Sequence, residues 1–215
     1  MIESLKIKEN TKEKEILLFN KVTKLHRINI LFGGNGVGKS TFLNGLKEGN
    51  FEIKSRKPIH ILSYKNSEDN KSIAKNAELK NKYDALRVYN SSGYSEGQSM
   101  IYFLMPFLYD IKDFAEKNSD KDVIVLIDEM DSALSIENIN MLLHVIVEIC
   151  NEYENVQFFI SSNHYHYAYV FKKVLSMYDG KWIDIDSYDD YFAKLNEGIQ
   201  IMHKANRDFS FLNVY

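Results

Sequence analysis

Cysteine is almost absent from this chain: Cys150 is the only one among 215 residues. A single cysteine cannot close an intrachain disulfide, and no cluster of cysteine and histidine has the spacing of a zinc site. Cys150 itself lies among apolar residues at helical spacing, where a small buried hydrophobe is the simplest interpretation. The sequence therefore excludes a scaffold held together by disulfides or by structural zinc.

Long hydrophobic runs are also missing. The longest candidate, residues 100–109, is too short to cross a bilayer and contains Pro106. The first fifteen residues are charged and lack the apolar core of a signal peptide. We therefore expect no direct membrane insertion and a cytoplasmic location.

A strong charge of one sign is lacking as well. The formal net charge is −3, which gives no general attraction to nucleic acid, so nucleic-acid binding would need a local patch. No internal repeat and no low-complexity tract occurs. The length and the ordinary hydrophobic and charged fractions predict one globular α/β domain over residues 1–215.

The most specific motif present is GGNGVGKS at residues 33–40, which fits the phosphate-loop pattern G-x-x-x-x-G-K-[ST]. It follows an apolar strand, Ile28–Phe32, and precedes a helix that we expect to begin near Lys39. Backbone amides of such a loop attract phosphate, lysine adds a full charge, and serine offers a hydroxyl to Mg²⁺. The predicted nucleotide-binding residues here are Gly33, Gly34, Asn35, Gly36, Val37, Gly38, Lys39, Ser40 and Thr41.

A second motif, VIVLIDEM, ends an apolar run in two adjacent carboxylates. Residues 123–127 predict a parallel strand buried on both faces, and ligands of α/β sheets bind at the carboxyl ends of such strands. We predict that Asp128, with Ser40, holds Mg²⁺ and that Glu129 is the general base for an attacking water. The alternative is a helix-capping feature, since Asp131 and Ser132 are also capping residues.

A third motif, SEGQ at residues 95–98, opens an apolar helix. A hydroxyl, a glycine and a helix N-terminus together make another anion site, to which Ser95, Gly97 and Gln98 would contribute. The alternative is a capping box between Ser95 and Gln98, and both interpretations can hold together.

In this order, the three motifs resemble those of ABC-type ATPases, with SEGQ similar to the S-G-G-Q/E signature. DEMDSALS is closer to the D-E-x-D-A-A-L-D of SMC and double-strand-break-repair ATPases than to the corresponding transporter sequence. The chain also resembles small bacterial proteins described as AAA family ATPases, several of which belong to anti-phage systems. The resemblance implies a P-loop NTPase fold: a mostly parallel sheet flanked by helices, with an N-terminal antiparallel β region.

The resemblance further implies ATP and Mg²⁺ as cofactors and a head-to-tail homodimer. In this family the signature of one subunit completes the nucleotide site of the other, so that two ATP molecules are sandwiched between the subunits. The chain departs from the family at Ser135, where the last aspartate of the D-loop is expected.

Two further family positions are less clear in this sequence. No glutamine occurs between Thr41 and Gly97, so Ser63 or Asn66, after the strand at residues 59–63, would replace the Q-loop residue. The switch histidine follows the strand Val156–Ser161, which runs into SSNHYHY. We predict that His164 is the catalytic switch residue, with Asn163 as the alternative.

The stretch between Lys39 and Ser95 is short for the helical subdomain of a transporter ATPase and shows no coiled-coil heptads. We therefore expect a bare ATPase head that controls a separate soluble effector protein, as the resemblance to anti-phage proteins implies. The alternatives are the nucleotide-binding subunit of a transporter and a slow nucleotide-sensing switch. Aromatic-rich segments at residues 164–171 and 182–192 predict a docking surface, or else a tyrosine-rich edge of the core.

The remaining expectations concern the rest of the chain. Residues 2–7 and 15–19 predict a hairpin-like pair joined by a polar turn. Phe19 would stack on adenine or serve as an ordinary core residue. Residues 72–82 predict a polar helix.

Overall fold

The computed structural model describes residues 1–65, 96–130 and 134–205. The chain divides into two compact units. One, the β6 unit, consists of Met1 and Arg56–Ile160. The other, the phosphate-loop unit, consists of Ile2–Ser55 and Ser161–Tyr215, so its two halves are far apart in sequence.

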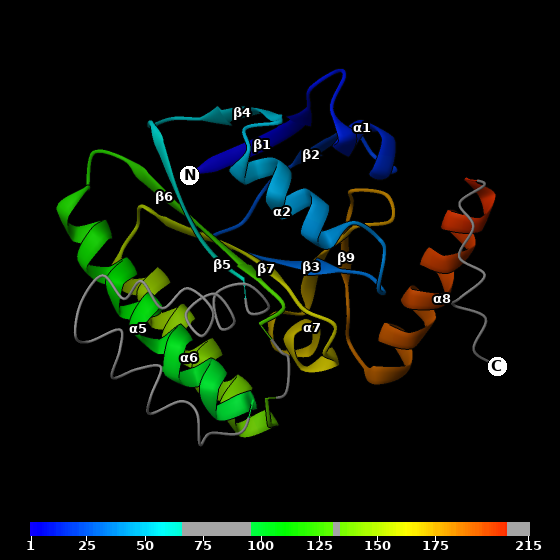
Figure 1. The fold of residues 1–215 in the computed structure, drawn as a ribbon. Helices are drawn as coiled ribbons and strands as arrows, with labels where there is room; N and C mark the ends of the chain where they lie inside the picture. The colour runs from blue at the N-terminus through cyan, green and yellow to red at the C-terminus, as the bar shows by residue number, and fades with distance from the viewer. Residues whose placement is uncertain (66–95, 131–133, 206–215) are drawn as a thin grey trace. The chain divides into compact units, whose positions relative to one another are not determined.

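The β6 unit is built on three parallel strands in the order β5, β6, β7: Ile59–Lys65, Asp122–Asp128 and Val156–Ser161. Every residue of β6 and β7 is buried, as the sequence predicts for strands covered on both faces. Helices α5 (Glu96–Lys117) and α6 (Ile136–Glu152) connect these strands and pack against each other (Figure 1). Helix α5 continues through Pro106.

The phosphate-loop unit contains an antiparallel sheet of order β2-β1-β4, formed by Lys21–Thr23, Ile2–Ile7 and Phe51–Ser55. The predicted N-terminal antiparallel region is confirmed, but its predicted second strand is wrong. Residues 15–19 do not pair with β1: residues 17–19 belong to no strand, and residues 15 and 16 are the end of helix α1 (Lys12–Ile16). Its alternating lysines and glutamates favour helix over strand.

A second group of strands in this unit carries the phosphate loop. Strand β3 (Ile28–Phe32) pairs in parallel with β8 (Lys173–Ser176), and β9 (Trp182–Asp184) pairs antiparallel with β8. The helices here are α2 (Lys39–Lys47), α7 (Tyr165–Phe171) and α8 (Tyr188–Lys204) (Figure 1). Helix α7 packs on β3, β8 and α8.

Individual expectations can be placed on this framework. Phe19 is buried, with its ring centroid 6.3 Å from that of Phe42, which agrees with a core residue. Cys150 is buried in α6, as expected. The polar helix predicted at residues 72–82 lies outside the described residues. Within the described part of the chain, no helix combines the length and apolarity that a membrane span requires.

Candidate phosphate-binding site

The glycine-rich loop between β3 and α2 has a backbone that only glycine adopts easily. Gly33 has φ of 148°, and a Cβ atom there would lie 2.7 Å from the side chain of Val37. Gly38 has φ of 102°, and a Cβ atom there would lie 2.7 Å from Leu17. Because glycine has no side chain, both positions can adopt this backbone and the loop can turn tightly. The predicted loop between strand and helix is therefore confirmed.

Helix α2 begins directly after this loop. Its N-cap is Gly38, which provides no side-chain hydrogen bond to the helix amides, and its first turn contains no acidic residue. Backbone amides at such a helix start carry partial positive charge. Ser40 and Thr41 lie in the same first turn, partly buried. The donor set therefore fits a phosphate group.

Lys39 is only 8% exposed, and its ammonium group is held by oxygen atoms. Lys39 Nζ donates to the carbonyl oxygens of Gly33 and Gly34, and to Asn163 Oδ1 at 2.7 Å. These three acceptors are neutral oxygen atoms. An anionic phosphate oxygen would be a stronger acceptor for the same ammonium group.

The contact between Lys39 and Asn163 is relevant to whether Asn163 or His164 is the switch residue. His164 is the N-cap of α7, and its Nδ1 atom accepts a hydrogen bond from the backbone N–H of His166 at 3.2 Å. The imidazole therefore caps a helix, whereas the neighbouring amide faces the phosphate-loop lysine. This arrangement favours Asn163, the alternative that the sequence left open, while a catalytic role of His164 stays a prediction.

Asn163 is itself held by α8. The Tyr191 hydroxyl donates to the Asn163 carbonyl oxygen at 3.0 Å. The Tyr191 ring also meets the ring of Phe32 edge to face, with centroids 5.4 Å apart. Because Phe32 ends β3 directly before Gly33, Tyr191 contacts both chain segments that flank the lysine.

A second tyrosine holds the loop from another side. The Gly34 N–H donates to the Tyr178 hydroxyl oxygen at 2.8 Å. Burial raises the pKa of the Tyr178 phenol, against the smaller opposite effect of this hydrogen bond, so the hydroxyl is neutral at physiological pH. Sequence reasoning missed Tyr178, because no pattern marks a tyrosine 144 residues away from its partner.

Helix α8 leaves no room beside Tyr178, which gives a testable prediction. A Cβ atom on Gly198 would lie 2.1 Å from the Tyr178 ring. Gly198→Ala should therefore lower the free energy of unfolding by about 1–3 kcal/mol through overpacking. Urea denaturation measures this change, with the exposed α8 substitution Asn196→Ala as control.

A gain in stability would contradict this prediction. Alanine in place of glycine in an unobstructed helix stabilises by about 1 kcal/mol. A Gly198→Ala protein more stable than the parent would show that α8 does not press on Tyr178 as the structure has it.

The predicted carboxylate pair lies at the carboxyl end of β6. Asp128 is the last strand residue and only 4% exposed, whereas Glu129 is exposed. Glu129 has φ of 58°, a left-handed conformation that is uncommon for a non-glycine residue and concentrated at functional sites. The alternative role as a helix cap does not apply to α6, which is capped by Ser135. Asp131 and Ser132 lie outside the described residues.

Lys65 is a neighbour of Asp128 that the sequence did not reveal. The predicted strand at residues 59–63 extends in the structure to Lys65, which is the register partner of Asp128 across β5 and β6. Ser63 lies further back, opposite Leu126, and Asn66 is outside the described residues. The last described residue of β5, beside Asp128, is thus a cation that directly precedes Asn66.

The signature motif is described only in part. Helix α5 begins at Glu96, so Gly97 and Gln98 lie in its first turn, as predicted. Ser95 is outside the described residues, and the anion-binding role of Ser95, Gly97 and Gln98 stays a prediction.

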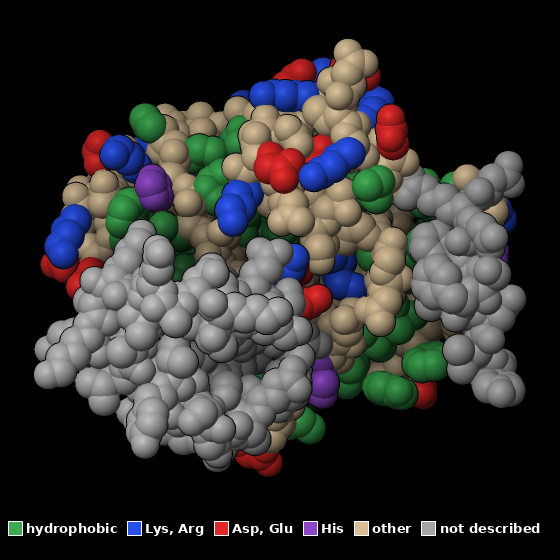
Figure 2. All heavy atoms as spheres, viewed as in Figure 1, with side chains coloured by type: hydrophobic (Ala, Val, Ile, Leu, Met, Phe, Trp, Pro, Cys, Tyr) green, Lys and Arg blue, Asp and Glu red, His purple; other side chains and the backbone are tan. Residues whose placement is uncertain are grey.

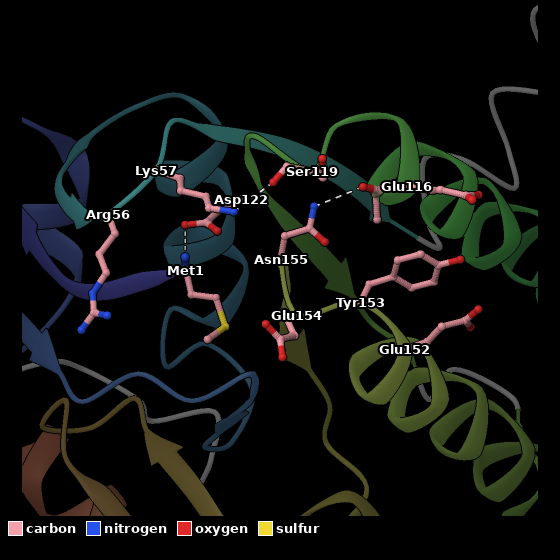
Figure 3. A pocket seen from close by; sticks show the side chains of 11 residues that line it. Met1, Arg56, Lys57, Glu116, Ser119, Asp122, Glu152, Tyr153, Glu154 and Asn155 are labelled. Atoms are coloured by element: carbon pink, nitrogen blue, oxygen red, sulfur yellow. Dashed lines mark hydrogen bonds and ion pairs between the residues drawn. The ribbon is translucent and has the colours of Figure 1, made fainter.

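The β6 unit also contains a cavity of about 560 Å³, at the end of β6 opposite Asp128. Figure 3 shows Arg56 and Lys57 on one part of its lining and Glu116 with Tyr153 on another. In the wall of the cavity, the side-chain amide of Asn155 donates to three backbone carbonyl oxygens, at 3.1–3.2 Å. Its lining mixes both signs of charge, and none of the predicted site residues contributes to it.

Comparison with known proteins bears on the fold. No protein-family model matches the sequence, and no curated protein does. Among solved structures, an ATP-binding subunit of an ABC transporter aligns with a TM-score of 0.51 and 14% identity, covering 91% of this chain and all of that one. An inward-facing transporter assigned to the metal-chelate ABC type also gives 0.51, with 15% identity, covering 94% of this chain and 89% of that one.

The chain has the fold of an ABC-type ATPase domain. The predicted fold class, with mostly parallel strands, flanking helices and an N-terminal antiparallel sheet, is therefore confirmed. The likeness at this level of identity concerns the fold alone, so the SMC-like grouping stays a prediction.

Proposed function

We propose that this chain is an ABC-type ATPase that binds ATP with Mg²⁺, hydrolyses it and controls a separate protein. The observation that carries the proposal is the buried Lys39, which lies over a glycine loop at the uncapped start of α2. A buried ammonium group beside the backbone amides of a helix N-terminus is suited to an anion that carries several charges.

The proposed roles follow from the chemistry of each side chain. The loop amides of residues 33–38 and Lys39 would bind the phosphates, and Ser40 with Asp128 would hold Mg²⁺ through oxygen ligands. The metal would neutralise charge on the phosphate oxygens. Glu129 would accept a proton from the attacking water.

Asn163 is proposed as the residue that responds to the γ-phosphate. Its Oδ1 atom accepts from Lys39, and its Nδ2 group has protons to donate to a phosphate oxygen. We further propose that both units form one ATPase domain and that ATP joins two copies head to tail, with Ser95, Gly97 and Gln98 facing the nucleotide of the other copy.

Removing the Lys39 charge should weaken nucleotide binding. Lys39→Ala loses a charge-assisted contact worth about 1.5–3 kcal/mol, so ATP affinity should fall about 10- to 150-fold. Calorimetric titration with Mg–ATP measures the change, and Lys47→Ala, at the exposed end of the same helix, is the matched control. Equal affinities of Lys39→Ala and the parent would remove the phosphate-loop assignment.

Asn163 and His164 can be separated by paired substitutions. Asn163→Ala should lower ATP turnover about 10- to 150-fold, because a hydrogen bond to a charged group is lost. His164→Ala should mainly lower stability, by about 1 kcal/mol, because it removes a helix cap. Phosphate release and urea denaturation of both variants provide the two measurements. A larger turnover loss for His164→Ala would restore His164 as the switch residue.

The identity of the partner protein distinguishes the proposed function from a second candidate. The two solved structures described above come from ABC transporters, which favours a transporter subunit as the alternative. Co-expression with the genomic neighbours distinguishes the two: a co-purifying effector protein supports control of a soluble partner, as in anti-phage defence, and a membrane permease supports transport. A protein that binds ATP but turns it over very slowly would be a nucleotide-sensing switch.

A further inference from the structure

Helices α7 and α8 present a group of aromatic side chains at the surface. The group, called here the aromatic face, consists of Tyr165, Tyr169, Val170, Tyr188 and Phe192. Tyr188 is 56% exposed and Phe192 52% exposed. Tyr165 joins the two helices, with ring centroids 5.6 Å from Tyr169 and 5.3 Å from Tyr188. Figure 2 shows hydrophobic side chains gathered at the lower right, over α7 and the start of α8.

Within the sequence segments that form this face, the charged groups are carboxylates. Residues 182–193 contain four aspartates and no lysine or arginine, and residues 161–171 contain no aspartate, glutamate, lysine or arginine. Asp186 and Asp189 are exposed at the start of α8. The nearest cations in sequence are Lys172 and Lys173 after α7, and Lys194, which pairs with Glu197 at 3.1 Å.

The composition of the face indicates the chemistry of its partner. Tyrosine rings bind a guanidinium group through their faces, and carboxylates bind it through paired hydrogen bonds. A nucleic acid would be repelled by the aspartates. A second copy in a two-fold contact would place one acidic segment near the other, which is also unfavourable. The charge pattern therefore favours a basic segment of another protein.

Tyr191 connects the aromatic face to the phosphate loop. Its ring lies 5.3 Å from that of Tyr165, and its hydroxyl donates to the Asn163 carbonyl oxygen. The Asn163 side chain in turn accepts from Lys39 Nζ. A ligand that moves Lys39 or Asn163 would therefore disturb the hydrogen bond from Tyr191 to Asn163. This would change the packing of Tyr191 against Tyr165 of the aromatic face.

We propose that the aromatic face docks an arginine-bearing, partly apolar segment of a partner protein, and that Tyr191 and Asn163 couple this docking to nucleotide at Lys39. The coupling rests on the proposed function, whereas docking itself does not require ATP. Tyr191 is a positioning residue in this arrangement, since it acts through Asn163.

The docking is tested with synthetic helical peptides of leucine and arginine, and with the same peptides carrying lysine or glutamate in place of arginine. Fluorescence anisotropy without nucleotide should show binding of the arginine peptide, weaker binding of the lysine peptide and none of the glutamate peptide. The double variant Tyr188→Ser, Phe192→Ser should bind at least about tenfold more weakly, a loss typical of interface anchors. Tyr109→Ser, at a 57% exposed tyrosine of α5, is the control and should bind as the parent does.

Three binding results would overturn the docking proposal. They are failure of the arginine peptide to bind, equal binding by the double variant, and equal binding of the glutamate peptide. Sedimentation of each protein is also measured without peptide. If the double variant sediments as a smaller species than the parent and Tyr109→Ser, a second copy covers the face and the proposal is likewise wrong. Because all the substituted side chains are exposed, thermal unfolding should be close to that of the parent and verifies the fold.

The coupling is tested by repeating the arginine-peptide titration with saturating Mg–ATP. In the parent, ATP should change the peptide affinity by about fivefold or more, the lower end of typical coupling between sites. Tyr191→Phe keeps the ring and removes the hydroxyl, so it should bind the peptide without showing the ATP effect. An unchanged ATP effect in Tyr191→Phe overturns the coupling, whereas failure of the parent to bind ATP would count against the proposed function and leave docking standing.

Discussion

Glu129→Gln is expected to lower ATP turnover by about 10²–10⁴ while leaving ATP binding intact. Glutamine keeps the shape and hydrogen-bonding capacity of the side chain but cannot accept a proton. The residue is exposed, at a left-handed backbone position directly after β6, so the substitution removes no core packing. With hydrolysis blocked, the ATP-bound homodimer should accumulate.

Phosphate release measures the turnover, and light scattering with Mg–ATP measures the mass. Glu148→Gln, at an exposed position of α6, makes the same chemical change away from the β6 end and should leave both measurements unaltered. A Glu129→Gln protein that stays monomeric at saturating ATP would count heavily against the sandwich arrangement, whatever its turnover.

Gly97→Asp is expected to abolish dimerisation and hydrolysis without weakening ATP binding by the monomer. Gly97 lies in the first turn of α5, where the proposed dimer would bring the γ-phosphate of the other copy. A carboxylate there faces a like charge, which costs several kcal/mol in an interface from which water is excluded. Gly97→Asn has nearly the same shape without the charge and is the matched control.

Mixing gives a further check on this prediction. Gly97→Asp protein combined with Lys39→Ala protein should form at most one working site per dimer, because each site takes its phosphate loop and its signature from different copies. Hydrolysis by Gly97→Asp at the parent rate would reduce SEGQ to an ordinary helix cap.

The sequence predicts those parts of the site where the local backbone requires a particular type of residue. The loop at residues 33–40 requires glycine where the structure has left-handed backbone, so its sequence pattern is specific. Strand β6 is recognisable because its interior, residues 123–127, is buried on both faces and wholly apolar before the strand ends at Asp128.

The contacts that could not be predicted join residues far apart in sequence. Asn163 meets Lys39 across 124 residues, and Tyr178 meets Gly34 across 144. Neither contact requires a particular spacing, so no sequence pattern marks it. The wrong strand at residues 15–19 has another cause. The apolar run at residues 16–19 resembles a strand, but Glu13 of α1 packs against Gly45 of α2, and this packing of one helix on the other opposes an extended chain.

The central claim is that this chain hydrolyses ATP at the phosphate loop, and phosphate release from Mg–ATP by the parent and by Lys39→Ala tests it most directly. The account predicts measurable release by the parent at saturating ATP, and release reduced about 10- to 150-fold in the variant at ATP concentrations well below saturation. Release that is absent from the parent, or equal in the two proteins, would contradict it.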